Sequence, residues 1–238
     1  MILTLAYHSI SDADYRYATK PEDFRRQLEY LKQRGARFVK AKELRTVIAG
    51  GSHQGALVAC VTFDDGLQDN YTNAFPILQE LGIPATVFVA TNLIGAKGHA
   101  RQFLSEEEIR TMHASGLVEI GNHTHTHALL KQLPDQEIEN EIRIAADAIA
   151  RITGNRPVSI AYPKGNYDAR VCSIAARSCA VGFGGEGIVE DAGTPDCMMI
   201  PRVMITRDLS MIRFRLMLFP WYWRARQSWI TIRRTLHI

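Results

Sequence analysis

Apolar residues in this chain follow two alternating patterns, continuous runs and helical spacing. Continuous apolar runs bounded by turn residues predict buried strands. Such runs occupy residues 2–7, 56–63, 85–90, 118–121 and 158–162, and shorter ones lie near residues 181 and 200. We expect each run to be a strand of one sheet.

In the segments between these runs, apolar residues recur at the spacing of an α-helix. Phe24, Leu28 and Leu31 recur at helical intervals, which predicts a helix with one buried face. Ser105 followed by Glu108 forms a capping box, and a helix should begin there. This helix should cover residues 105–115, and further helices are expected over residues 74–81, 135–153 and 168–177.

Strand–helix alternation predicts a parallel sheet covered by helices, either open or closed into a barrel. In such folds the functional residues lie in loops at the carboxyl ends of the strands. The polar residues that follow strands here are His8, Asp64, Asp65, residues 123–127 and residues 163–165. We therefore expect these side chains to meet at one rim of the sheet.

Composition narrows the class of protein. The chain has 238 residues, of which 46% are hydrophobic and 22% charged, and this excludes disorder, collagen-like repeats and a disulfide scaffold. Four widely spaced cysteines predict free thiols in a reducing compartment. The first residues resemble no signal peptide and no apolar run is long enough to span a bilayer, so we expect a cytoplasmic protein.

Charge is distributed unevenly along the chain. The net charge is +3, yet six arginines, no acidic residue and all three tryptophans follow Asp208. The acidic balance of residues 1–208 argues against nucleic acid as a partner. We expect residues 1–208 to form the folded domain and residues 209–238 to form a basic, aromatic tail. Three roles for this tail remain open: contact with the inner face of the membrane, a helix packed on the domain, or a subunit interface.

Two adjacent carboxylates, Asp64 and Asp65, follow a predicted buried strand. Ionising both in a small cavity is costly unless a cation is present. Asp65-Gly66 is also a common turn dipeptide, so a purely structural turn is an equally good interpretation of this segment alone.

Three alternating histidines, His123, His125 and His127, follow another predicted strand. On a helical turn His123 and His127 would share one face, and in an extended segment all three would, so both conformations favour a divalent metal. Two imidazoles, one carboxylate and open positions describe a catalytic metal site. Asp65 can supply that carboxylate, which leaves Asp64 to act as a base on water.

The segment TFDDG at residues 62–66, followed by GNHTHTH at residues 121–127, resembles the first two motifs of the polysaccharide deacetylase family, the fourth family of carbohydrate esterases. Members of this family fold as a single distorted (β/α) barrel with mostly parallel strands and remove acetyl groups from sugars with a divalent metal, often zinc. The resemblance covers residues 3–203. It implies that Asp64 is the catalytic base and that Asp65, His123 and His127 bind the metal, for which we expect Zn²⁺.

The third family motif is altered in this chain. Its arginine position holds Ala161, which leaves Lys164 and Arg202 as candidates to pair with Asp64. The resemblance implies that the backbone N–H of Lys164 stabilises the oxyanion. It also implies a substrate-binding surface, formed by Tyr162, Pro163, Gly165 and Tyr167, with His125 as a substrate contact or a spectator.

The late Leu-x-His motif that carries the family's general acid is absent. Instead, LAYHSI at residues 5–10 resembles an N-terminal element of a branch that includes poly-N-acetylglucosamine deacetylases. We therefore expect His8 to be the general acid. The alternative is a histidine that only satisfies local backbone groups.

These features predict a metal-dependent hydrolase that removes N-acetyl groups from an amino sugar in a polysaccharide or a lipid-linked glycan. Two alternatives remain open. One keeps the fold and metal but acts as a deformylase or as an amidohydrolase on a small non-sugar amide. The other is a catalytically inactive carbohydrate-binding barrel, which the altered third motif would allow.

Overall fold

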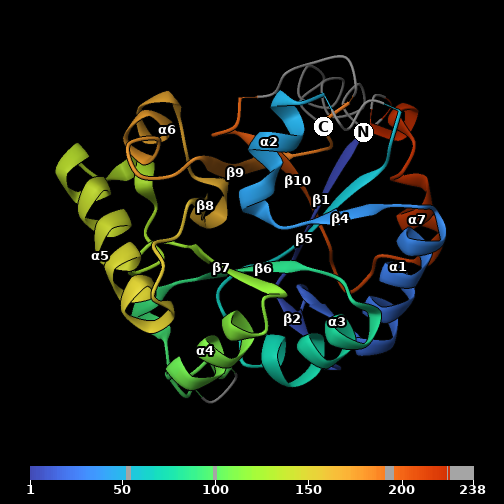
Figure 1. Ribbon diagram of the computed structural model, residues 1–238, viewed down its shortest axis with the longest axis horizontal. Helices are drawn as coiled ribbons and strands as arrows, with labels where there is room; N and C mark the ends of the chain where they lie inside the picture. Colours follow the sequence, from blue (N-terminus) through green and yellow to red (C-terminus); the bar gives the residue numbers. More distant parts are fainter. Residues whose placement is uncertain (52–54, 99–100, 191–195, 224, 226–238) are drawn as a thin grey trace.

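Seven parallel strands close into a barrel, as the computed structural model shows for residues 1–51, 55–98, 101–190, 196–223 and 225 (Figure 1). Around the barrel the strands are β1 (Ile2–Tyr7), β5 (Val58–Phe63), β6 (Ala85–Val89), β7 (Val118–Asn122), β8 (Ser159–Ala161), β9 (Val181–Glu186) and β10 (Ile200–Met204). Strand β1 closes the ring because it pairs with both β5 and β10. The expected single (β/α) barrel is therefore confirmed, and it is closed.

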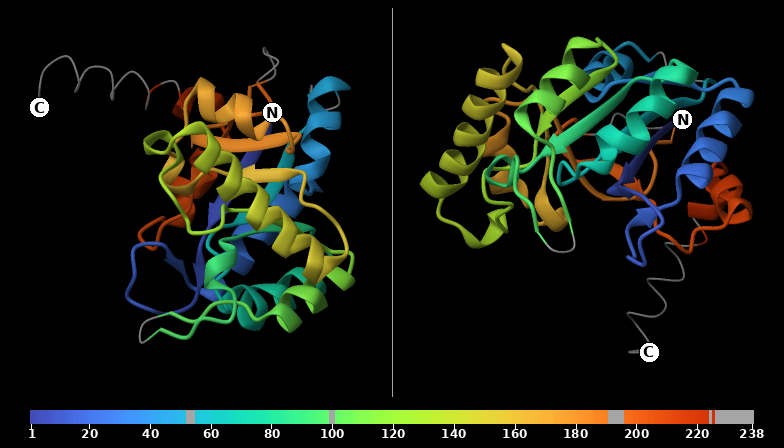
Figure 2. Two further views of the ribbon diagram at one scale, coloured as in Figure 1. Left: turned by 90° about the vertical axis from the view of Figure 1, so that its left-hand side faces the viewer. Right: turned by 90° about the horizontal axis from the view of Figure 1, so that it is seen from below.

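Helices surround the barrel on the outside (Figures 1 and 2). They are α1 (Pro21–Gln33), α3 (Phe75–Leu81), α4 (Glu106–Ala114), α5 (Asp135–Thr153), α6 (Ala169–Ala175) and α7 (Met211–Leu216). The shorter elements are β2 (Ser9–Ile10), β3 (Ala18–Thr19), β4 (Arg37–Val39), α2 (Leu44–Ala49), the 3₁₀ turns η1 (Ala41–Glu43), η3 (Thr91–Leu93), η4 (Leu130–Gln132) and η5 (Pro163–Gly165), and the π turn η2 (Asn70–Ala74). In the described part of the chain, no helix has the length and apolar character needed to span a bilayer.

Local signals placed the long elements correctly. The helix expected over residues 135–153 is α5, with the same bounds. At α4 the Ser105 side chain accepts a hydrogen bond from the Glu108 N–H, and the Glu108 carboxylate accepts one from the Ser105 N–H. The sequence did not predict the short elements β2, β3, β4, α2 and α7, because each is too short to show a period.

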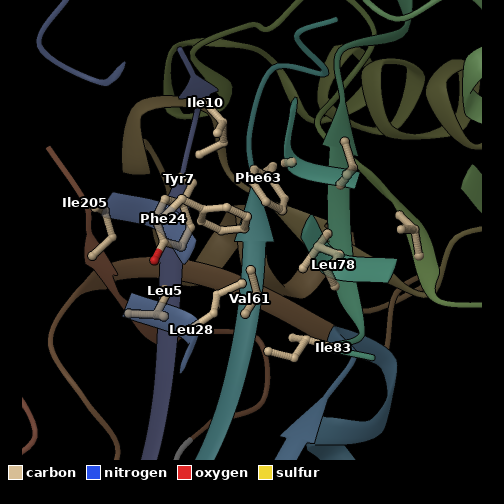
Figure 3. Packing of buried hydrophobic residues seen from close by; sticks show 14 of the residues in the cluster. Leu5, Tyr7, Ile10, Phe24, Leu28, Val61, Phe63, Leu78, Ile83 and Ile205 are labelled. Atoms are coloured by element: carbon tan, nitrogen blue, oxygen red, sulfur yellow. The ribbon is translucent and has the colours of Figure 1, made fainter. Parts of the chain in front are cut away.

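The apolar core has two layers, inside and outside the barrel wall. Along β5, Val58 and Cys60 belong to an inner cluster, while Val61 and Phe63 belong to an outer cluster under the helices. Alternation of this kind follows from the two-residue period of a strand. Figure 3 shows part of the outer cluster, where Phe24 from α1 lies beside Phe63. Both clusters are closed to solvent, so the barrel is a packed core whose rim is left for chemistry.

The start of the expected tail packs on the barrel. Phe214, Met217, Leu218 and Trp223 are buried in the outer cluster, and the Trp223 indole N–H donates to the Met217 carbonyl at 2.8 Å. For this stretch the packed-helix alternative describes the contacts. The remainder of the tail, residues 224 and 226–238, lies outside the described residues, and the boundary at residue 208 stays a prediction.

Gly121 on β7 has no room for a side chain. A Cβ there would lie 2.4 Å from two ring carbons of Phe88 and 3.0 Å from the Ser159 Oγ. We predict that Gly121→Ala lowers the free energy of unfolding by about 1–3 kcal/mol, the usual cost of overpacking. Urea unfolding followed by circular dichroism measures it. Adding Phe88→Leu should recover part of the loss, and strictly additive effects would contradict the proposed clash.

Candidate active site

The rim at the carboxyl ends of the strands gathers the residues expected there. Asp64 and Asp65 follow β5, and His123 and His127 follow β7. His8 follows β1, and the carbonyl of the preceding Tyr7 accepts a hydrogen bond from the Asp64 N–H at 2.9 Å. The sequence therefore predicted correctly which loops converge.

Asp65, His123 and His127 form a cluster that could hold a metal ion. Their ligand atoms lie within 4.8 Å of one another. The Asp65 Oδ1 is 3.6 Å from the His123 Nε2 and 3.4 Å from the His127 Nε2. No other such group of three occurs in the part of the chain that the structure describes. One carboxylate and two imidazoles are a donor set typical of catalytic zinc or non-haem iron sites.

The histidine loop adopts neither of the two conformations expected from its spacing. It is irregular, with Thr124 at φ 66° and His127 at φ 61°. These left-handed residues turn the chain so that the rings of His123 and His127 lie 4.9 Å apart between centroids. The correction has a physical cause, because spacing alone cannot foresee a left-handed residue that is not glycine.

Helix α5 holds this loop in place. The Glu141 carboxylate accepts hydrogen bonds from the backbone N–H groups of His125 and Thr126, at 2.9 and 2.8 Å. The Asn122 side chain donates to the Ile142 carbonyl and accepts from the Thr124 N–H. Sequence reasoning missed Glu141 and Asn122, because their role depends on how α5 docks against β7.

His123 is oriented for ligation by the neighbouring strand. Its Nδ1 lies 2.7 Å from the Ala161 carbonyl oxygen, so Nδ1 carries a proton, and in the neutral ring Nε2 keeps a lone pair on the side of Asp65. Burial lowers the pKa of His123, but the carboxylates of Asp64 and Asp65 raise it more, and the net shift is upward. A bound divalent cation would balance the negative charges of Asp64 and Asp65, so the residues fit a metal. Burial, together with His123, lowers the pKa of His127 and favours its neutral form.

Asp64 is paired with Arg202, which settles the question left open by the altered third motif. Both side chains are nearly inaccessible, and two hydrogen bonds of 2.7 Å join the guanidinium to the two carboxylate oxygens. Burial alone would raise the pKa of Asp64, but Arg202 outweighs it and holds this pKa well below its ordinary value. The Arg202 Cζ lies 5.8 Å from the ring centroids of both Phe88 and Phe183.

His8 lies between β1 and β2 with its ring stacked on Tyr17, 4.9 Å between centroids. Its Nδ1 is buried and has no hydrogen-bond partner in the described part of the chain. Burial lowers its pKa despite the nearby Asp64 and Asp65. The alternative of a histidine that satisfies local backbone groups receives no support from this ring.

The altered third motif forms one wall of a groove of about 1280 Å³ beside the rim. Lys164, Gly165 and Tyr167 line the groove, whereas Tyr162 and Pro163 are buried beneath them. Tyr162 stacks on Tyr167 with 5.1 Å between ring centroids, so the buried Tyr162 supports the wall from below. Lys164 has φ 54°, and its backbone N–H donates to no acceptor among the described residues.

Gly184 on β9 also lines this groove. Tyr167 lies so close to β9 that a Cβ on Gly184 would be 2.1 Å from its ring, which requires glycine there.

The His125 Nδ1 lies 2.9 Å from the Thr91 hydroxyl, and His125 is not part of the cluster of Asp65, His123 and His127.

We predict that Arg202→Met lowers the free energy of unfolding by about 3–5 kcal/mol, because it leaves the Asp64 carboxylate buried without a partner. Arg202→Lys should lose less, since it keeps the charge but not the two-pronged hydrogen bond. The measurement is unfolding by urea, because guanidinium chloride is a salt and would screen the charges of the ion pairs under test. The matched control is Arg151→Met, which breaks an exposed Arg–carboxylate pair with Glu106 and should have little effect. Equal losses in both variants would contradict this account.

Comparison with known proteins agrees with this geometry. The polysaccharide deacetylase family profile matches residues 52–179. A poly-β-1,6-N-acetyl-D-glucosamine N-deacetylase of Staphylococcus epidermidis is 31% identical over 204 residues, which are 81% of this chain and 69% of that protein. The match to YxkH of Bacillus subtilis, at 29% identity over 174 residues, covers 73% of this chain and only 60% of that protein.

Two solved structures share the fold. The Streptococcus pyogenes deacetylase PplD, in complex with acetate, superposes with a TM-score of 0.81 at 25% identity and covers 92% of this chain and 98% of its own. IcaB from Ammonifex degensii gives a TM-score of 0.77 at 29% identity and covers 87% and 92%. The motifs, the barrel and these similarities together show that this chain belongs to the polysaccharide deacetylase family.

Proposed function

We propose that this chain is a metal-dependent N-deacetylase of an amino-sugar glycan, of the poly-β-1,6-N-acetylglucosamine type. The observation that carries the proposal is the convergence of Asp65, His123 and His127 beside the ion-paired Asp64 at one rim. The name of the Staphylococcus epidermidis relative supports the choice of substrate. The adjoining groove of about 1280 Å³ has room for several sugars, which favours a glycan over a small non-sugar amide.

Asp65, His123 and His127 would hold the divalent cation, and we propose zinc because of the nitrogen and oxygen donor set. When bound, such a cation supplies Lewis acidity and lowers the pKa of water. Asp64 would take the proton from the attacking water. Arg202 keeps that carboxylate ionised and fixes both of its oxygens.

Lys164 and His8 would complete the reaction. The backbone N–H of Lys164 would donate to the oxygen of the acetyl group as negative charge develops on it. His8 would donate a proton to the leaving nitrogen as the C–N bond breaks, since an amine leaves poorly as an anion. The products are acetate and the free amino sugar, and Tyr167 and Gly165 would contact the sugar.

We predict that Asp64→Asn lowers turnover of N-acetylated β-1,6-glucosamine oligomers by about 100-fold or more, the usual contribution of a general base. The measurement pairs acetate release with elemental analysis of the same preparations. The variant should keep its metal, because Asp64 is not among the three ligand residues. Near-full turnover with metal retained would refute the assigned role. Release of formate or ammonia in place of acetate would favour the alternative amidohydrolases, and metal without any hydrolysis would favour the inactive barrel.

We also infer that α7 and the residues after it contact an anionic membrane surface. Ile212 and Trp221 are 71% and 56% exposed, although neighbouring residues of this stretch are buried in the core. Arg213 and Arg215 lie in the same short helix, and four more arginines follow without an acidic residue. Exposed apolar and aromatic side chains among arginines suit the headgroup region of a bilayer. The cytoplasmic location expected from the sequence stays a prediction.

We predict that Ile212→Ser/Trp221→Ser reduces co-sedimentation with phosphatidylglycerol vesicles by at least about threefold, because apolar burial drives insertion. Ile144→Ser is the matched control, since Ile144 is 37% exposed on α5, which lies opposite α7 in Figure 1. The full chain is needed, because removal of residues 209–238 would also remove core residues such as Phe214. Unchanged binding of the double variant, or equal binding to phosphatidylcholine vesicles, would refute the inference.

A further inference from the structure

A buried hydrogen-bond network joins the segment after the first motif to the segment that carries His8. Asn70 is fully buried, and its Nδ2 donates to the His8 carbonyl at 2.7 Å and to the Asp69 Oδ1 at 3.1 Å. Asp69 in turn accepts hydrogen bonds from the Ser9 hydroxyl at 2.5 Å and from the Ile10 N–H at 3.0 Å. The mechanism proposed above uses none of these groups.

The orientation of the Asn70 amide is determined by its surroundings. Both neighbours of its Nδ2 are acceptor oxygens, so a flipped amide would place oxygen against oxygen. The Oδ1 is buried without a partner in the described part of the chain. A buried polar atom left unsatisfied costs stability, so the two hydrogen bonds that Nδ2 donates must offset this cost.

His8 needs such an anchor because its Nδ1 is not held by a hydrogen bond within the described part of the chain. Catalytic histidines are usually oriented by a partner on the second ring nitrogen. The Nδ1 of His8 has no partner among the described residues, and the ring only stacks on Tyr17. The position of the ring therefore depends on the backbone that carries it.

Two successive carbonyls hold that backbone to the segment of the base. The Tyr7 carbonyl accepts from the Asp64 N–H at 2.9 Å, which continues the pairing of β1 with β5. The His8 carbonyl lies beyond the last residue of β1, and there the Asn70 side chain replaces the missing strand partner. Asp64 and Asn70 belong to one short segment, so this contact sets the separation of base and acid.

We propose that Asn70 is a positioning residue for His8, and that it couples the placement of the general acid to that of Asp64. The proposal rests on the proposed function, because it takes His8 as the proton donor. Asp69 holds the two residues that follow His8, because its carboxylate accepts the hydrogen bonds of Ser9 and Ile10.

The chemistry of the leaving group separates this role from a merely structural one. Cleavage of an N-acetyl group transfers one proton from His8 to the nitrogen, while water supplies the hydroxyl of acetate. Cleavage of 4-nitrophenyl acetate uses the same water and base, but 4-nitrophenolate leaves without a proton. A displaced His8 should therefore impair amide hydrolysis and spare ester hydrolysis.

The experiment compares Asn70→Ala and Asn70→Ser with Tyr7→Phe in the full chain loaded with metal. We expect the asparagine variants to lower kcat on N-acetylated oligomers by about 10- to 100-fold, the range of a displacement of about 1 Å. The KM on these oligomers and the turnover of 4-nitrophenyl acetate should change much less. Tyr7→Phe removes the buried hydrogen bond of 2.7 Å that the Tyr7 hydroxyl of β1 donates to the Gln27 side chain of α1. It should lose stability without changing the ratio of amide to ester turnover.

A double-mutant cycle on the amide substrate gives a second measurement that does not need the ester. If Asn70 acts through His8, Asn70→Ala should cause little further loss in a His8→Gln background. Additive losses, or parallel losses of amide and ester turnover in both asparagine variants, would overturn the proposal. Failure of the proposed function is distinguishable, because the unaltered chain loaded with metal would then release no acetate from the N-acetylated oligomers.

Discussion

The buried ion pair between Arg202 and Asp64 is the interaction on which the rest of this site depends. A carboxylate that is almost inaccessible to water stays ionised only when a cation and hydrogen bonds replace its hydration. The pair joins β10 to β5 across β1, so it ties together two strands that do not pair directly in the ring. Phe88 and Phe183 provide the apolar floor against which the guanidinium is packed.

Backbone strain is concentrated around this pair. Among the described residues, the non-glycine residues with positive φ are Asp65, Thr124, His127 and Lys164, and all of them lie at the rim. A left-handed residue that is not glycine costs about 1–3 kcal/mol, so the surrounding structure must hold it. Glu141 on α5 does this for the histidine loop, with two hydrogen bonds to its backbone. The surrounding structure therefore fixes these rim residues in backbone conformations that they would rarely adopt otherwise.

The barrel also explains how the chain departs from the third family motif and still places a guanidinium beside Asp64. The third motif lacks its arginine, because Ala161 occupies that position on β8. The guanidinium comes instead from Arg202 on β10, two strands further around the ring. The proposed acid likewise comes from the start of the chain, since β1 is the neighbour of β5. A closed ring of parallel strands delivers residues to one rim from any strand, so their order in the chain matters little.

Local sequence determined the long elements and the candidate chemistry of this protein. Apolar periodicity and caps are properties of neighbouring residues, so they placed α5, the start of α4 and the strand at Ile2–Tyr7. The carboxylates and histidines could likewise be identified from residue types and spacing. Only the tertiary structure decided that Arg202 pairs with Asp64, that α5 holds the histidine loop, and that Asn70 reaches the His8 carbonyl. These contacts join separate segments of the chain. Closure of the barrel places β1 between β5 and β10 and so brings the first and third contacts about, whereas the second depends on how α5 docks against β7.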